Sequence, residues 1–226
     1  MAIIAKRRSG ESVLIKSLIY EDWRFMFHKI YVFTDSTYNK FYKQFLSRIH
    51  EGYDAGEINK IIDSQKGKLN SRDVNDPENI RVLIILDDIM RVKHSEALLR
   101  LCNQGRHLHV SICMALQDSV LISREMRDQL DIIVSFRQSS KIARERLVHG
   151  YMATDDLKHG ERVLMDATKE PYSALVIDNT SNSYDLEEFT YTYKVEKQPP
   201  ETFETCDDRN YRWLEDLKDK YAQMKV

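Results

Sequence analysis

The sequence predicts an α/β fold with a mostly parallel central sheet. Short, strongly apolar segments alternate along the chain with amphipathic, helix-like segments, which is the pattern of strand–helix–strand units. The segment 82–86, Val-Leu-Ile-Ile-Leu, is apolar at every position, as expected for a strand covered by helices on both faces. Polar residues follow several of the apolar segments directly, at the ends where open α/β sheets bind ligands.

The first 150 residues supply the alternating elements. The expected strands are residues 3–4, 29–33, 82–86, 110–116 and 132–136. The expected helices are residues 12–20, 57–62, 95–103, 123–130 and 141–149. In addition, Phe41, Phe45 and Ile49 recur at i, i+4 and i+8, which predicts a helix there.

The pattern changes after about residue 160. Residues 162–165 and 173–177 are apolar and close together, which predicts a closing β-hairpin. Residues 189–195 alternate with period two, as an edge strand does.

The domain boundary is expected near residue 180. Pro199-Pro200 indicates a linker, and the charged segment 211–224 is helix-like. We therefore expect one domain over residues 1–180 and a C-terminal extension over 181–226, made of the edge strand, the linker and the terminal helix.

Composition limits the function classes. The chain has 226 residues, 42% of them hydrophobic and 31% charged, as in an ordinary globular protein with one sizeable domain. Its net charge of −2 argues against a protein that coats nucleic acid as a monomer. No run of eighteen apolar residues is present, so no membrane partner is expected. The three cysteines form no C-x-x-C pair, which favours reduced thiols.

The segment "AKRRSGES", residues 5–12, has the length and position of a phosphate-binding loop, G-x-x-x-x-G-K-[ST]. It lies between an expected strand and an expected helix, so backbone N–H groups and the helix N-terminus would face an anion. Gly10 permits close approach, and Ser12 would place its hydroxyl on Mg²⁺. Two positions depart from the pattern: Ala5 replaces the first glycine and Glu11 replaces the lysine.

Two further groups stand at strand ends. Asp87 and Asp88 follow the strand 82–86, and Gln117 follows the strand 110–116. The first carboxylate suits a hydrated Mg²⁺, and the second suits an attacking water that must be oriented or deprotonated. Gln117 would contact the γ-phosphate or that water. Taken singly, paired acids after a strand are also typical of turns or helix caps. A glutamine at the end of a strand is also typical of an ordinary surface residue.

Three segments, "IIAKRRSGES", "VLIILDD" and "NQGRHLHVSICMALQD", together resemble the genome-packaging ATPases of large DNA viruses. These form the poxvirus-type branch of the FtsK/HerA superfamily of P-loop motors. The resemblance implies a RecA-like P-loop NTPase fold with ATP and Mg²⁺ as cofactors. The implied nucleotide-binding residues are Lys6, Arg7, Arg8, Ser9, Gly10, Glu11, Ser12 and Val13, the metal ligands Ser12 and Asp87, and the catalytic residues Asp88, Gln117 and Arg106.

The resemblance also implies partners and a location. It predicts a homo-oligomeric ring, a pentamer or hexamer, that moves double-stranded DNA into a capsid in contact with capsid or portal proteins. The expected location is the host cytoplasm, in the viral factory, or the virion. In such a ring, Arg106 would reach a neighbouring subunit's γ-phosphate as an arginine finger, although a helix-capping or solvent-facing role suits it equally. Lys141, Arg144 and Arg146 form either a DNA-contacting helix face or, more simply, a solvated one.

Glu11 is the departure with consequences for activity. A lysine–phosphate attraction at ~4 Å is worth on the order of 4 kcal/mol at an effective dielectric of 20. Glutamate removes this attraction and adds a repulsion of similar size, so we expect a motor with impaired nucleotide binding and turnover. Two alternatives remain open from the sequence. One is a P-loop kinase for a small molecule or nucleoside, and the other is a non-catalytic structural subunit.

Overall fold

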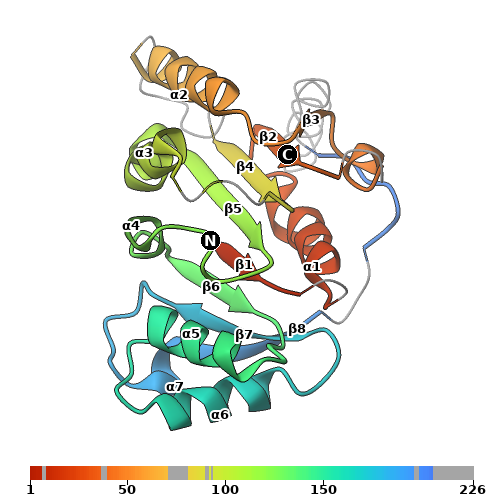
Figure 1. Cartoon of the computed structure of the whole chain (residues 1–226). Helices are drawn as coiled ribbons and strands as arrows, with labels where there is room; N and C mark the ends of the chain where they lie inside the picture. Colours follow the sequence, from red (N-terminus) through yellow and green to blue (C-terminus); the bar gives the residue numbers. More distant parts are fainter. Residues whose placement is uncertain are drawn as a thin grey trace, which may run out of the picture.

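The computed structural model describes residues 1–6, 9–36, 40–70, 81–89, 92, 94–195 and 199–205. Within these residues the central feature is an eight-stranded sheet with strand order β3-β2-β4-β5-β1-β6-β7-β8. Figure 1 shows the sheet extending from β3 to β8 with helices on both sides.

The sheet has a parallel part and an antiparallel edge. The parallel strands, in sheet order, are β3 (Arg48–Glu51), β2 (Lys29–Thr34), β4 (Val82–Asp87), β5 (Val110–Leu116), β1 (Ala2–Ile4) and β6 (Ile132–Ser135). The antiparallel edge consists of β7 (Ser173–Asp178) and β8 (Thr190–Lys194). Because parallel strands end at the same edge, the residues that follow β1, β4 and β5 lie near one another.

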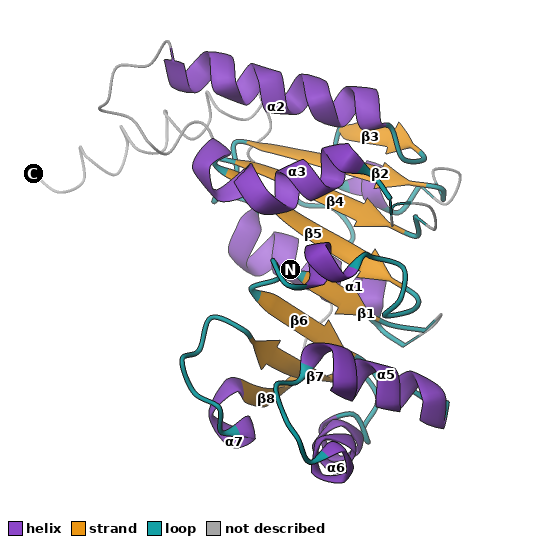
Figure 2. Cartoon of the chain, turned by 60° about the vertical axis from the view of Figure 1, so that its left-hand side comes forward, coloured by secondary structure: helices purple, strands orange, loops and turns teal. Residues whose placement is uncertain are grey.

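Helices cover both faces of this sheet, as Figure 2 shows. One face packs against α2 (Ala55–Asn70), α3 (Glu96–Gln104), α4 (Arg124–Arg127), α5 (Lys141–Tyr151), α6 (Leu157–Ala167) and α7 (Leu186–Phe189). The other face packs against α1 (Glu11–Leu18), the π-helical turn Ile19–Trp23 and the 3₁₀ turn Tyr42–Gln44.

Strand β4 explains why both layers are needed. Its side chains alternate between the two cores, with Ile84 and Leu86 on the α2–α3 side and Leu83 and Ile85 on the α1 side. All four are at most 2% exposed. Full burial of such a side chain contributes about 1.5–3 kcal/mol, so an uncovered face on this strand would be costly.

The predicted fold class and strand placement are confirmed. The strand that precedes Gln117 lies between the strand of the phosphate-loop segment and the strand that ends in Asp87. In register, Ile84 pairs with Ile112 and Ile3 with Ala115, both in parallel. The sheet therefore brings the three sequence motifs to one edge.

The helix predicted across Phe41, Phe45 and Ile49 is wrong. Only a single 3₁₀ turn, Tyr42–Gln44, forms there, and Ile49 belongs to β3. The i, i+4 spacing of the two phenylalanines arises because this turn packs them edge to face, with ring centroids 5.5 Å apart. The apolar positions thus reflect an aromatic cluster and not a continuous helix.

The hairpin predicted from residues 162–165 and 173–177 is also wrong. Residues 162–165 lie within α6, where Gly160, Leu164 and Ala167 are buried at helical spacing. Asp156 caps this helix by accepting a hydrogen bond from the His159 N–H at 2.9 Å. The antiparallel pair at this edge is instead β7 with β8, which is the edge strand that the alternation of residues 189–195 predicts.

Two further expectations concern the C-terminal helix and membrane-spanning segments. The helix expected at residues 211–224 lies outside the described residues. In the part of the chain that the structure does describe, no helix is both long enough and apolar enough to cross a membrane.

Candidate nucleotide-binding site

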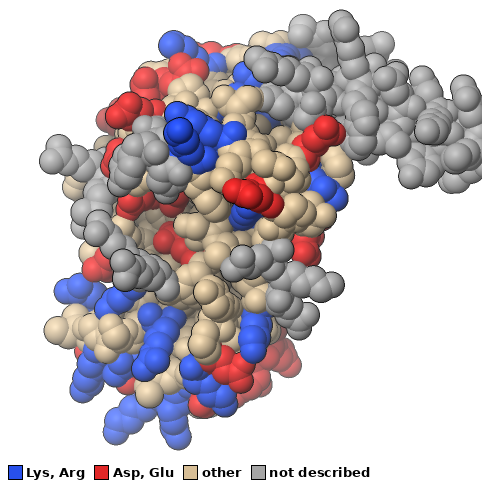
Figure 3. All heavy atoms as spheres, turned by 90° about the vertical axis from the view of Figure 1, so that its right-hand side faces the viewer, with Lys and Arg blue, Asp and Glu red and all other residues tan. Residues whose placement is uncertain are grey.

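The segments with candidate functional residues meet at the carboxyl edge of the parallel strands. The loop that begins at Ala5 follows β1, Asp88 follows β4, and Gln117 follows β5. Figure 3 looks onto the side toward which these strands point in Figure 1, and acidic side chains lie near its middle, with many Lys and Arg side chains below them.

The loop after β1 turns into α1 at Gly10. Gly10 is the N-cap of α1 with φ 111°, a left-handed conformation that side chains rarely adopt. The loop is closed by the Ser9 N–H, which donates to the Lys6 carbonyl at 3.2 Å. The first helical hydrogen bond runs from the Leu14 N–H to the Gly10 carbonyl at 2.9 Å. The N–H groups of residues 11–13 therefore have no acceptor within the helix, which makes this end suited to an anion.

Glu11, which the sequence pattern aligns with the lysine of a phosphate loop, is the first residue of α1. Burial and, to a smaller extent, the nearby carboxylates of Asp87 and Asp88 together raise the pKa of its carboxyl group to about 8. At neutral pH the Glu11 side chain is therefore mainly protonated. The Glu11 carboxyl group therefore carries no full negative charge until the pH rises above 8.

Asp87, the last residue of β4, is held by Tyr42. The Tyr42 hydroxyl donates to Oδ2 of Asp87 at 2.9 Å. Burial raises the pKa of Asp87, and the hydrogen bond from Tyr42 opposes that shift by favouring the ionised form. Burial and the nearby Asp87 carboxylate raise the pKa of Tyr42 well above its ordinary value, so Tyr42 remains a donor.

Asp88 is the centre of a second hydrogen-bond group. Its Oδ1 accepts from Nε2 of Gln117, and its Oδ2 accepts from the Ser36 hydroxyl at 3.1 Å. The Asp88 backbone is left-handed, with φ 57°, which aspartate tolerates better than most residues. The structure therefore brings together Asp88 and Gln117, two of the three residues predicted to be catalytic.

The remaining residues of the predicted phosphate loop differ in surroundings. The Lys6 ammonium donates to the Ser139 hydroxyl at 2.6 Å, on the side of β6. The Ser9 hydroxyl donates to the Lys6 carbonyl and stabilises the loop itself. Ser12 is exposed at the start of α1 and Val13 is half-buried. Arg7 and Arg8 lie outside the described residues.

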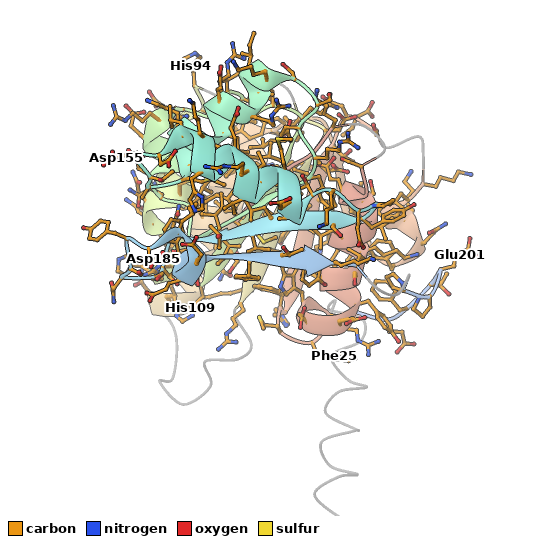
Figure 4. The ribbon with its side chains drawn as sticks, turned by 90° about the horizontal axis from the view of Figure 1, so that it is seen from below. Phe25, His94, His109, Asp155, Asp185 and Glu201 are labelled. Carbon is orange, nitrogen blue, oxygen red and sulfur yellow. The ribbon has the colours of Figure 1, made fainter. Side chains whose placement is uncertain are left out.

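Arg106 lies at the opposite edge of the sheet. It belongs to the 3₁₀ turn Gly105–Leu108, which precedes β5, and its guanidinium pairs with Asp131 at 2.9 Å. Arg106 precedes β5 and Gln117 follows it, so the two residues lie at opposite ends of that strand. Figure 4 shows His109, the residue just after this turn, on the opposite side of the molecule from Glu201. Arg106 therefore cannot complete the site of its own subunit, and any role at a phosphate requires a second copy of the chain.

The basic residues of α5 have acidic partners. Lys141 lies 3.6 Å from Glu145, Arg144 3.8 Å from Glu161, and Arg146 4.0 Å from Asp118. Lys141 and Arg146 are exposed, which favours a solvated face at those two positions, whereas the side chains of Arg144 and Glu161 are only 20% and 21% exposed.

Sequence reasoning missed two residues of the site, Tyr42 and Ser36. The sequence signal for Tyr42 was its position between Phe41 and Phe45. Because these two phenylalanines were interpreted as one face of a helix, Tyr42 was not considered as a site residue. Ser36 follows β2, and only the parallel pairing of β2 with β4 reveals that a residue after β2 lies near Asp88.

A parallel α/β sheet with a glycine loop opening a helix and an acid pair on a nearby strand is the architecture of the P-loop ATPases. The chain belongs to the poxvirus A32 protein family, whose family model matches residues 1–196. It is 28% identical over 218 residues to the uncharacterized protein 088R of Invertebrate iridescent virus 3. The match covers 92% of this chain and 82% of that protein. It is 24% identical over 210 residues to the uncharacterized protein L437 of Acanthamoeba polyphaga mimivirus, covering 86% and 72% respectively.

Solved structures share the fold. B204, the DNA-packaging ATPase from Sulfolobus Turreted Icosahedral Virus, matches with a TM-score of 0.55 and 18% identity, over 87% of this chain and 97% of B204. The genome packaging NTPase B204 from Sulfolobus turreted icosahedral virus 2 in complex with ATP-gammaS matches with a TM-score of 0.52 and 16% identity, over 85% and 95%. The pCW3 conjugation coupling protein TcpA, with ATPgS, matches with a TM-score of 0.61 and 12% identity, over 86% and 59%.

Proposed function

We propose that this chain is the ATPase subunit of a motor that translocates double-stranded DNA into a viral capsid. The observation that carries the proposal is the hydrogen bond between Gln117 and Asp88, at the same edge as the glycine loop. This pairing puts a water-orienting carboxylate next to an amide that can contact a terminal phosphate. Membership of the poxvirus A32 family and the shared fold of packaging ATPases support the same function.

The side chains fit a magnesium–nucleotide complex. Mg²⁺ in such sites is held by one or two carboxylates, phosphate oxygens and waters. Ser12 offers a hydroxyl at the start of α1, and Asp87 offers a carboxylate held in place by Tyr42. When bound, Mg²⁺ would neutralise phosphate charge during hydrolysis.

The other residues of the site bind the phosphates, activate the water and contact the γ-phosphate. Backbone N–H groups at Gly10 to Val13 bind the phosphates. Asp88 orients or deprotonates the attacking water, and Gln117 contacts the γ-phosphate or that water. Arg106 acts on the γ-phosphate of a neighbouring subunit in a pentameric or hexameric ring. The weak, exposed pair with Asp131 leaves Arg106 able to exchange partners, since such surface pairs contribute little stability.

The wider assembly follows from the same proposal. DNA passes through the ring and contacts it through backbone phosphates, so binding is sequence-tolerant and salt-sensitive. Capsid or portal proteins hold the ring in the viral factory of the host cytoplasm or in the virion. Residues 1–180 form the motor and residues 181–226 its C-terminal extension.

The form with Glu11 is impaired in this function. A neutral Glu11 supplies no attraction for phosphate, and a bound nucleotide would raise the pKa of this carboxyl group further, so binding is accompanied by proton uptake above pH 8. The same residue supports the alternative of a non-catalytic structural subunit.

Calorimetry of ATP binding tests the phosphate site. We expect weak or absent binding for the chain as it stands and micromolar-to-millimolar affinity for Glu11→Lys in the presence of Mg²⁺. Glu11→Gln is the matched control, because it removes the titrating group without supplying a cation. Equal affinity of all three forms would show that the loop is not the phosphate site.

A further inference from the structure

An aromatic ring lies directly beside the phosphate loop in a backbone conformation that does not suit it. Tyr172 has φ 61°, in the left-handed region where bulky residues are outliers. Residues 170–173 form a β-turn closed by the Ser173 N–H, which donates to the Glu170 carbonyl at 3.3 Å. Pro171 precedes Tyr172, so Tyr172 occupies the turn position that normally favours glycine or asparagine. A strained residue of this kind is a starting point for a functional hypothesis.

The ring of Tyr172 covers Gly10. A Cβ atom on Gly10 would lie only 2.9 Å from Cδ1 of Tyr172 and 3.3 Å from Cε1 of Phe136. Tyr172 is nevertheless 47% exposed, whereas Phe136 is 1% exposed. One part of the Tyr172 ring therefore packs on the loop and another part is available to a ligand.

The turn that presents this ring is fixed on two sides. The Glu170 carboxylate pairs with the Lys194 ammonium at 2.6 Å, and the Val195 N–H donates to the Tyr172 carbonyl at 3.3 Å. Both contacts join the turn to the end of β8. The ring is therefore preorganised beside the loop, which lowers the entropy cost of ligand binding.

The order of strands gives the direction of a bound nucleotide. Asp88 and Gln117 follow β4 and β5, on one side of β1, and they define where the terminal phosphate lies. Tyr172 immediately precedes β7, on the other side of β1. With the terminal phosphate near Gln117 and the phosphate chain along Gly10, the nucleoside extends toward β6 and β7, where the Tyr172 ring lies.

We propose that Tyr172 is the stacking platform for the base of the bound nucleotide. The inference rests on the proposed function, because it takes the loop 5–12 as the phosphate site. Stacking on an aromatic ring recognises the planar face of a base and little of its edge. The site should therefore accept different purine nucleotides with similar affinity and bind pyrimidine nucleotides more weakly, because their smaller ring overlaps less.

Binding to the Glu11→Lys protein tests the proposal with three ligands, ATP, AMP and inorganic tripolyphosphate. Tyr172→Gly removes the ring and suits the left-handed backbone, so this variant should fold with an unchanged or higher melting temperature. It should weaken ATP and AMP binding about tenfold and leave tripolyphosphate binding within twofold. Tyr172→Trp should retain nucleotide affinity. Tyr184→Gly is the matched control, since Tyr184 is 91% exposed in another loop.

A spectroscopic signal separates stacking from a merely structural role. The fluorescence of a 2-aminopurine nucleotide, measured at saturation, should be quenched by the Glu11→Lys protein and by its Tyr172→Trp form, but not by its Tyr172→Gly form. Unchanged nucleotide affinity and quenching in Tyr172→Gly would overturn the inference alone. Equal loss of tripolyphosphate and ATP binding would also overturn it, since the ring would then only support the loop. If Glu11→Lys binds neither ATP nor tripolyphosphate, the proposed function fails and the inference fails with it.

Discussion

Tyr42 and Asp87 are joined by a hydrogen bond of 2.9 Å between a buried hydroxyl and a carboxylate at the end of β4. The bond connects the aromatic cluster on the α1 face of the sheet to the proposed Mg²⁺ ligand. The rings of Phe41 and Phe45 both pack against the Tyr42 ring, with centroids 5.0 and 6.0 Å from it, and against each other at 5.5 Å. Phe203 stacks on Phe45 at 4.7 Å. The geometry of Asp87 therefore depends on packing well outside the sequence motif.

Loss of this hydroxyl should change the pH dependence of activity. In the Glu11→Lys background, Tyr42→Phe keeps the ring and removes the donor, so the pKa of Asp87 rises and its ionised form is less populated. We expect the acidic limb of the Mg²⁺-dependent ATPase profile to shift to higher pH and the apparent Mg²⁺ affinity to fall severalfold. Phe45→Leu, which disturbs packing but keeps the hydroxyl, is the comparison. An unshifted profile in Tyr42→Phe would mean that Tyr42 does not position Asp87.

The two acids should have separable effects. In the same background, Asp87→Ala should weaken Mg²⁺–nucleotide binding. Asp88→Asn should leave binding nearly intact and reduce hydrolysis by about two orders of magnitude or more, because a water-orienting group is lost. Calorimetry and steady-state ATPase assays measure the two properties. Normal hydrolysis by Asp88→Asn would reduce Asp88 to a turn residue.

Glu11 should make stability depend on pH. Its pKa is about 8 in the folded chain and near 4.5 in the unfolded chain, so the folded state binds the extra proton between these values. Stability should therefore fall as pH rises from about 4.5 to 8, by about 1.4 kcal/mol for each unit of pKa shift.

Urea unfolding at several pH values checks this expectation. The difference in unfolding free energy between Glu11→Gln and the parent chain isolates Glu11 from Asp87, whose pKa is also raised by burial. We expect that difference to grow in favour of Glu11→Gln above pH 5. A difference that stays constant from pH 5 to pH 8.5 would contradict a buried, titrating Glu11.

Arg106 should support ATP hydrolysis at the site of a neighbouring subunit and not at the site of its own subunit. In the Glu11→Lys background, ATPase activity should rise more than linearly with protein concentration, as ring assembly completes each site. Subunits that also carry Arg106→Ala should lower the activity of mixed rings beyond simple dilution. Asp131→Ala is the control, since it removes the partner of Arg106 but keeps the cation. If Arg106→Ala subunits act only as inert diluent, the arginine-finger role is excluded.

The sequence was sufficient to predict the central parallel strands and the meeting of three motifs at one edge, but not β3 or the pairing of β7 with β8. Apolar segments such as 82–86 carry a clear strand signal, and polar residues at strand ends converge in any parallel sheet. The hydrogen-bonded pair of Asp88 and Gln117 follows from that rule once β5 is placed beside β4.

Other features needed the three-dimensional structure. The Tyr42 contact with Asp87 joins residues 45 positions apart, and no local pattern encodes it. The raised pKa of Glu11 depends on burial and on two carboxylates at the end of β4, which is distant in the sequence. The strain at Tyr172 is a backbone property, visible only once the turn before β7 is built.

DNA stimulation of ATP hydrolysis by the Glu11→Lys protein tests the central claim most directly. A packaging motor should hydrolyse ATP severalfold faster with duplex DNA of any sequence than without it, and the stimulation should decline as salt is raised. A self-contained kinase would show no dependence on DNA, and a non-catalytic subunit would show no ATPase activity even in the Glu11→Lys form. ATP hydrolysis that duplex DNA leaves unchanged at low salt, or its complete absence, would contradict the account.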